Sequence, residues 1–104
     1  MFKRIKEIES RFEELERLLS DPDVIGKQAV YQRYAKEHAD LRELVEAFRL
    51  YEKTEAQIRE AQELLRGGDE DIREMAKEEL PILKEALAGL EQRLKRLLLP
   101  KDPN

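Results

Sequence analysis

No proline or glycine interrupts the chain from Lys27 to Arg66. Within this stretch, residues suited to a buried or boundary position return every three or four places, the spacing of one face of an α-helix. They are Tyr31, Tyr34, His38, Leu41, Val45, Phe48, Glu52, Glu55, Ile58, Gln62 and Leu65, with Ala35, Leu44, Tyr51 and Ala61 widening the stripe. The pattern predicts a single helix over about residues 27–66, roughly 60 Å long at 1.5 Å per residue.

The segments on either side of this long helix have the same apolar spacing, which predicts helices over about 2–19 and 69–99. Pro22 and Gly26 interrupt the pattern between the first two helices, and the pair Gly67-Gly68 is expected to end the second with a left-handed cap. The flanking stripes are Phe2, Ile5, Ile8, Phe12, Leu15 and Leu18/Leu19, and then Ile72, Met75/Ala76, Leu80, Leu83, Leu87, Leu90, Leu94 and Leu97.

Pro81 lies inside the third predicted helix, where it removes one backbone donor. Because Leu80 and Leu83 keep the apolar phase across it, we expect one kinked helix rather than two. Pro100 is expected to end the element.

Three apolar stripes joined by short loops predict an all-α fold, an antiparallel three-helix bundle or coiled coil. From the helix lengths, the three helices are expected to overlap only near the termini, which leaves a two-helix hairpin arm and an elongated domain. The helical domain is expected to cover residues 1–99, and residues 100–104 to begin a linker.

Composition excludes several classes of protein. Charged residues make up 42% of the 104, but the net charge is only -4, so there is no basic footprint for sequence-specific nucleic-acid binding. The sequence has no cysteine for disulfides or thiolate zinc sites, and no apolar run long enough to cross a membrane. A soluble cytoplasmic protein is the expectation.

Reactive groups are not paired in the way that catalysis requires. His38 stands alone in an apolar stripe and is expected to be a core or boundary residue rather than a metal ligand. Tyr31, Tyr34 and Tyr51 have helical spacing, which favours packing over base stacking. We therefore expect no catalytic residue, no cofactor and no metal site, and a non-enzymatic interaction module.

Two stretches go beyond a generic coiled coil. "REMAKEEL" (73–80) and "LLLPKDPN" (97–104) closely resemble the N-terminal domain of the bacterial peptide chain release factor 1 family. The order of a short helix, a "DPDV" loop, a long helix, an acidic hairpin and a third helix matches as well.

This resemblance implies a parent protein that terminates translation at UAA and UAG by promoting peptidyl-tRNA hydrolysis on the ribosome. In the family, a Gly-Gly-Gln loop and a codon-reading tripeptide lie in domains that follow the Pro-Lys-Asp-Pro segment. Neither occurs in this chain, and its Gly-Gly pair, Gly67-Gly68, is followed by Asp69 rather than Gln. The chain would then be the non-catalytic arm of the factor.

The resemblance further implies that the arm projects towards the stalk base of the large ribosomal subunit, near the GTPase release factor. The residues expected to contact a partner are those of the hairpin tip: Gly67, Gly68, Asp69, Glu70 and Asp71. A purely capping role for these residues is the open alternative.

A second class of function is a free-standing coiled-coil module that acts by interaction or dimerisation. The arm is expected to leave one side of the stripe from Phe48 to Leu65 thinly covered, through which the isolated domain, otherwise a monomer, could form a weak dimer.

Overall fold

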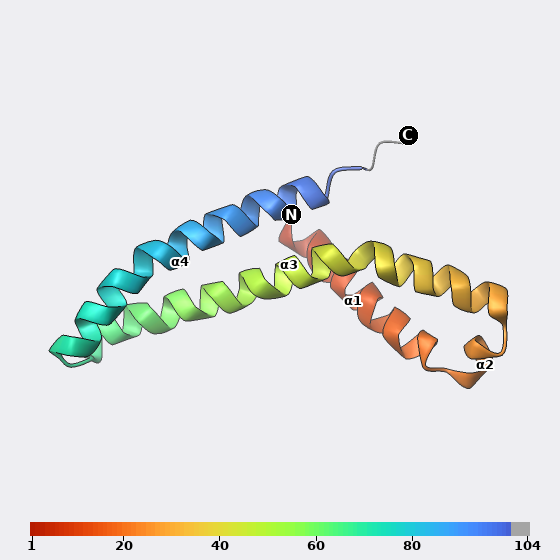
Figure 1. Cartoon of the computed structure of the whole chain (residues 1–104), viewed down its shortest axis with the longest axis horizontal. Coiled ribbons are helices and arrows are strands. Elements are labelled where there is room, and N and C mark those ends of the chain that lie inside the picture. Colours follow the sequence, from red (N-terminus) through yellow and green to blue (C-terminus); the bar gives the residue numbers. More distant parts are fainter. Residues whose placement is uncertain (101–104) are drawn as a thin grey trace. The chain divides into compact units, whose positions relative to one another are not determined.

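The computed structural model describes residues 1–100, and all of their regular structure is helical, which confirms the all-α class. Figure 1 shows the helices in chain order: α1 (Phe2–Leu19), α2 (Pro22–Ile25), α3 (Gln28–Gly67) and α4 (Glu70–Leu97). The chain divides into two compact units, Met1–Glu46 and Ala47–Asn104, and α3 contributes one half to each.

The predicted helix boundaries are right to within two residues, the ordinary uncertainty of helix ends. One element was missed. Asp21 accepts a hydrogen bond from the backbone N–H of Asp23 at 2.9 Å, and Pro22 follows it at the first helical position, so the predicted break forms the one-turn helix α2. The predicted linker begins at Pro100, outside α4, and its remaining residues 101–104 lie outside the described part of the chain.

Unit 1 pairs α1 with the first half of α3 in antiparallel directions. Ile5, Phe12 and Leu15 are the buried residues of α1, in the predicted stripe. The ring of His38 stacks on that of Phe12 with centroids 4.1 Å apart and planes inclined by 15°. His38 Nε2 is buried and has no hydrogen-bond partner within residues 1–100, and the Glu16 carboxylate is 3.7 Å away. His38 is thus a boundary residue, as predicted.

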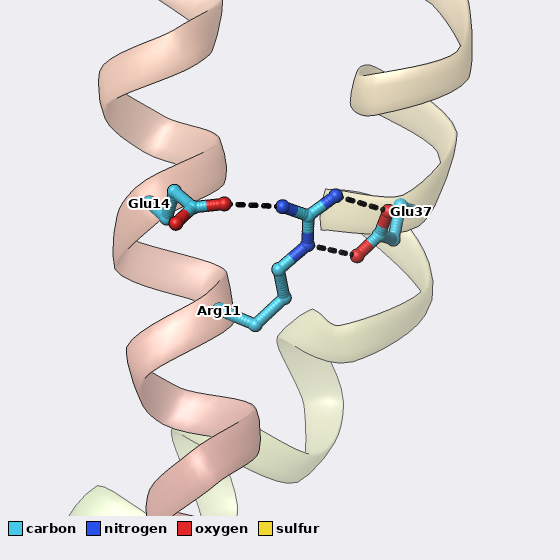
Figure 2. A network of polar contacts seen from close by, with 3 residues as sticks. All are labelled: Arg11, Glu14 and Glu37. Carbon is cyan, nitrogen blue, oxygen red and sulfur yellow. Dashed lines mark hydrogen bonds and ion pairs between the residues drawn. The ribbon is translucent and has the colours of Figure 1, made fainter.

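An ion-pair network also joins α1 to α3 (Figure 2). Arg11 donates two hydrogen bonds to the Glu37 carboxylate, from Nε at 2.6 Å and from Nη2 at 2.8 Å, and a third to Glu14. This fork geometry is the strong form of a carboxylate–guanidinium contact. The hydrogen bonds from Arg11 lower the pKa of Glu37 below its ordinary value of 4.5.

Because the pKa of Glu37 is lowered by folding, its contribution to stability is present above pH 4.5 and is lost as the pH falls through the folded value. Replacing Arg11 by Met should lower the free energy of unfolding at pH 7 by about 1 kcal/mol or less, because the side chains of Arg11 and Glu37 are both more than a third exposed to solvent. The deficit should shrink as the pH falls below 4.5. Urea titrations between pH 7 and pH 2 measure it, with Glu13→Gln, an exposed carboxylate of α1, as the control. A deficit that does not change with pH would contradict this account.

Unit 2 pairs the second half of α3 with α4. Its core cluster consists of Ile58, Ala61, Ala76 and Leu80, and Leu65, Leu83 and Leu87 pack against it. Ala61 and Ala76 are the two small residues of this cluster. Pro81 lies within the continuous helix α4, which confirms one helix rather than two.

The buried seam of α3 follows the predicted stripe at Leu44, Val45, Phe48, Tyr51, Ile58 and Ala61. It departs from the stripe where Thr54 is buried, Gln62 is exposed and Glu55 is only half-buried. Thr54 is accommodated because its hydroxyl donates to the Leu50 carbonyl at 2.8 Å, which satisfies the polar group inside the helix. Tyr51 is buried too, and this burial raises the pKa of its hydroxyl.

Two expectations about exposed and buried apolar residues are wrong, the first of them in part. Phe48, Tyr51 and Ile58 are buried, so the stripe is well covered up to Ile58, whereas Gln62 is exposed and Leu65 is half-buried. Tyr31 is exposed rather than packed, while Tyr34 is half-buried and lies beneath the guanidinium groups of Arg11 and Arg33.

Candidate partner-contact site at the hairpin tip

The tip of unit 2 is the turn at which α3 ends and α4 begins (Figure 1). Gly67 is the last residue of α3, Gly68 and Asp69 form the turn, and Glu70 opens α4. The structure therefore brings all five predicted contact residues together at one helix junction. Four of them are exposed and Gly68 is half-buried.

Gly68 is required by close packing rather than by a left-handed backbone. Neither tip glycine has a positive φ, so the predicted left-handed cap is wrong. A Cβ atom on Gly68 would lie 2.7 Å from the Leu64 carbonyl oxygen and 2.8 Å from Cγ2 of Ile72. The Gly68 N–H donates to that same carbonyl at 2.9 Å, which holds the backbone close.

Asp69 is the N-cap of α4. Its carboxylate accepts a hydrogen bond from the backbone N–H of Ile72 at 3.0 Å, satisfying one of the free donors of the first turn. Arg73 reaches back across the turn, and its Nη1 donates to the Gly68 carbonyl at 3.0 Å. Asp69 and Arg73 thus fix the turn. For Asp69, this supports the capping role rather than a contact with a partner.

Glu70 and Asp71 have a different position. Both are exposed in the first turn of α4, and neither carboxylate is needed for the cap that Asp69 supplies. Their charges are favourable next to the positive end of the helix dipole, and they remain accessible to a basic partner. An electrostatic contact between the tip and a partner would therefore use the carboxylates of Glu70 and Asp71.

Within the described residues, no group of three or more His, Asp or Glu side chains is arranged to hold a metal ion. The tip is an acidic turn suited to contact with basic groups.

A second surface, on the outer side of α4, was not predicted from the sequence. Met75 and Ile82 are exposed there, and with Glu78 and Glu79 they line a shallow groove of about 280 Å³. The predicted stripe left open whether Met75 or Ala76 faces the core, which was the one sequence signal for this surface. The structure buries Ala76 and exposes Met75.

Each helix within residues 1–100 is too polar or too short to cross a lipid bilayer.

Comparison with known proteins gives a consistent set of relatives. The family model described as the PCRF domain matches residues 8–104. The chain is 65% identical over 104 residues to peptide chain release factor 1 of Syntrophus aciditrophicus (strain SB), 50% identical to that of Desulfatibacillum aliphaticivorans and 48% identical to that of Geotalea uraniireducens (strain Rf4).

Each of these alignments covers all of this chain and 29% of the relative, at its N-terminal end. The chain thus spans less than a third of the length of the curated relatives that it matches. No solved structure matches it.

Proposed function

Because the chain belongs to the PCRF domain family, we propose that it serves as the non-catalytic N-terminal domain of a class I peptide chain release factor. The observation that carries the proposal is the 65% identity over the whole chain to release factor 1 of Syntrophus aciditrophicus. The parent factor would terminate translation at UAA and UAG in the cytoplasm by promoting peptidyl-tRNA hydrolysis. The chemistry would lie in other domains, since Gly67 and Gly68 are followed by a capping Asp69 in a helical turn.

A chimeric factor tests this assignment. Residues 1–104 would replace the matching region of the Syntrophus aciditrophicus factor, and peptide release would be measured on ribosomes programmed with UAA, UAG or UGA. The chimera should release peptide at UAA and UAG at close to the rate of the unmodified factor. Loss of release by a chimera that still folds would overturn the proposal.

The proposed role of this domain is to dock the factor near the stalk base of the large subunit, where the GTPase release factor also acts. Its support is the exposed pair Glu70 and Asp71 at the end of unit 2, an acidic surface that suits basic ribosomal protein. It would position the factor without contacting the reacting bond.

Reversing both charges, with Glu70→Lys and Asp71→Lys, should weaken ribosome binding by the chimera about 5- to 10-fold while leaving release at saturating factor unchanged. Asp69 is kept so that the N-cap survives. The control is Glu60→Lys with Glu63→Lys, the same charge change at exposed positions of α3. Fluorescence titration of each variant with ribosomes measures the two affinities. Equal affinity for both variants would mean that the tip is a solvated cap without a docking role.

A further inference from the structure

The outer side of α4 exposes the two largest apolar side chains of that helix that are not needed for its packing. Met75 is 69% exposed and Ile82 is 68% exposed, whereas Ala76 and Leu80 on the inner side are buried. The positions 75, 78, 79 and 82 recur at steps of three and four, so they share one face over two turns. The shallow groove of about 280 Å³ lies between these four side chains. We call this surface the outer patch.

The charges around the outer patch all have one sign. The positions three or four residues from Met75 or Ile82 are occupied by Asp71, Ile72, Glu78, Glu79, Glu85 and Ala86. Four of these are acidic and none is basic. Residues two places away, including Lys77 and Lys84, project from other sides of the helix. The Arg73 side chain is directed to the Gly68 carbonyl. An apolar groove is therefore bordered by carboxylates on both sides.

We propose that the outer patch binds a cationic amphipathic helix of a partner protein. One apolar side chain of that helix would enter the groove between Met75 and Ile82. Lysine or arginine side chains would lay their aliphatic stems on the same apolar surface and pair with Glu78 and Glu79. A second copy of this chain is the poorer occupant, because it would bring two sets of carboxylates together. Anionic lipid and nucleic acid are poor occupants too, because the same carboxylates would repel their phosphate groups.

The small size of the outer patch implies weak binding, with a dissociation constant on the order of 100 µM for a single isolated helix. Electrostatic attraction across the carboxylate border should make binding weaker at higher salt. These two properties define the test.

The probe is a synthetic helical peptide of about 15 residues built from Leu and Lys, with the leucines on one face, titrated into the 104-residue chain. The negative probe has Glu in place of Lys. The patch variant carries Met75→Gln and Ile82→Gln, which leaves the buried side of α4 intact. The control variant carries Leu50→Gln and Leu64→Gln, two exposed leucines of α3.

The patch variant should bind the Lys peptide about tenfold more weakly, and the control variant should stay within about twofold of the original chain. Replacing Glu78 and Glu79 by Gln should weaken binding and flatten its salt dependence. The Glu peptide should not bind. Equal weakening in patch and control variants would show unspecific attraction to an acidic protein and overturn the proposal.

Two further results would also overturn it. Concentration-dependent dimerisation in sedimentation, abolished by Met75→Gln with Ile82→Gln, would make a second copy the occupant. Binding of the Lys peptide by the 104-residue chain but not by the chimeric factor would mean that the remainder of the factor covers the outer patch. The second result leaves the release activity of the chimera, and so the proposed function, untouched.

Discussion

Replacing Leu15 by Ala should lower the free energy of unfolding by about 2–5 kcal/mol, the range for removing a large aliphatic side chain from a packed core. Leu15 is 0% exposed and lies on the buried face of α1 with Ile5 and Phe12. Leucine and alanine both favour helix, so the loss would come from burial and from the cavity rather than from helix propensity. Against a total stability of about 5–15 kcal/mol for a typical domain, this loss is large.

Leu50→Ala provides the matched control for Leu15→Ala. It is the same change within a helix, but at a side chain that is 48% exposed, and it should alter stability by no more than about 0.5 kcal/mol. Equilibrium unfolding in urea, followed by circular dichroism, gives both values. Similar small losses for the two variants would contradict the assignment of Leu15 to the core.

The two neighbouring tip glycines should respond to alanine in opposite directions. Gly68→Ala should destabilise the protein by about 1–3 kcal/mol, because its Cβ would collide with the Leu64 carbonyl and Ile72 Cγ2 and push apart the hydrogen bond that closes the turn. Gly67→Ala should stabilise it by about 0.5–1 kcal/mol, since nothing lies within 4 Å of its Cβ position and alanine favours helix.

The steric explanation for Gly68 makes a further distinction. Adding Ile72→Ala to Gly68→Ala should recover only part of the loss, after allowing for the effect of Ile72→Ala alone. It removes one of the two collisions and leaves that with the Leu64 backbone oxygen. Thermal unfolding of the single and double variants measures this. A stabilising Gly68→Ala would mean that the turn opens without cost.

The existence and length of the long helices could be predicted because their signals are local. An uninterrupted apolar period and flanking Gly or Pro residues decide where a helix runs, and Asp69 and Glu70 place the start of α4 to within a residue. The short helix α2 had a signal too, an Asp N-cap followed by Pro at the first position. In the apolar pattern alone, these residues are only a break between two helices.

The rotation of the helices was harder to predict because it depends on the partner helix. On α3, the sequence placed Glu55 and Gln62 at heptad steps and Ala61 only as a widening of the stripe, whereas the structure buries Thr54 and Ala61 and leaves Gln62 exposed. Small residues at an interface carry little hydrophobic signal, yet they allow close helix approach. On α4, the sequence likewise could not decide between Met75 and Ala76 as the buried residue, so the exposure of Met75 was not predicted. The five tip residues were adjacent in sequence, so their proximity was predictable, while the steric role of Gly68 required coordinates.

Residues 20–27, which include the one-turn helix α2, connect α1 to α3 within unit 1, and residues 68–69 connect α3 to α4 within unit 2. Closing such short loops costs little entropy, and proteins dominated by local contacts fold quickly. Each helix pair should therefore form from its own turn. During synthesis, α1 and the first half of α3 can associate as soon as they leave the ribosome, while α4 is still being made. The order of the helices thus suits folding in the direction of translation, with few opportunities for one helix to wait exposed for a distant partner.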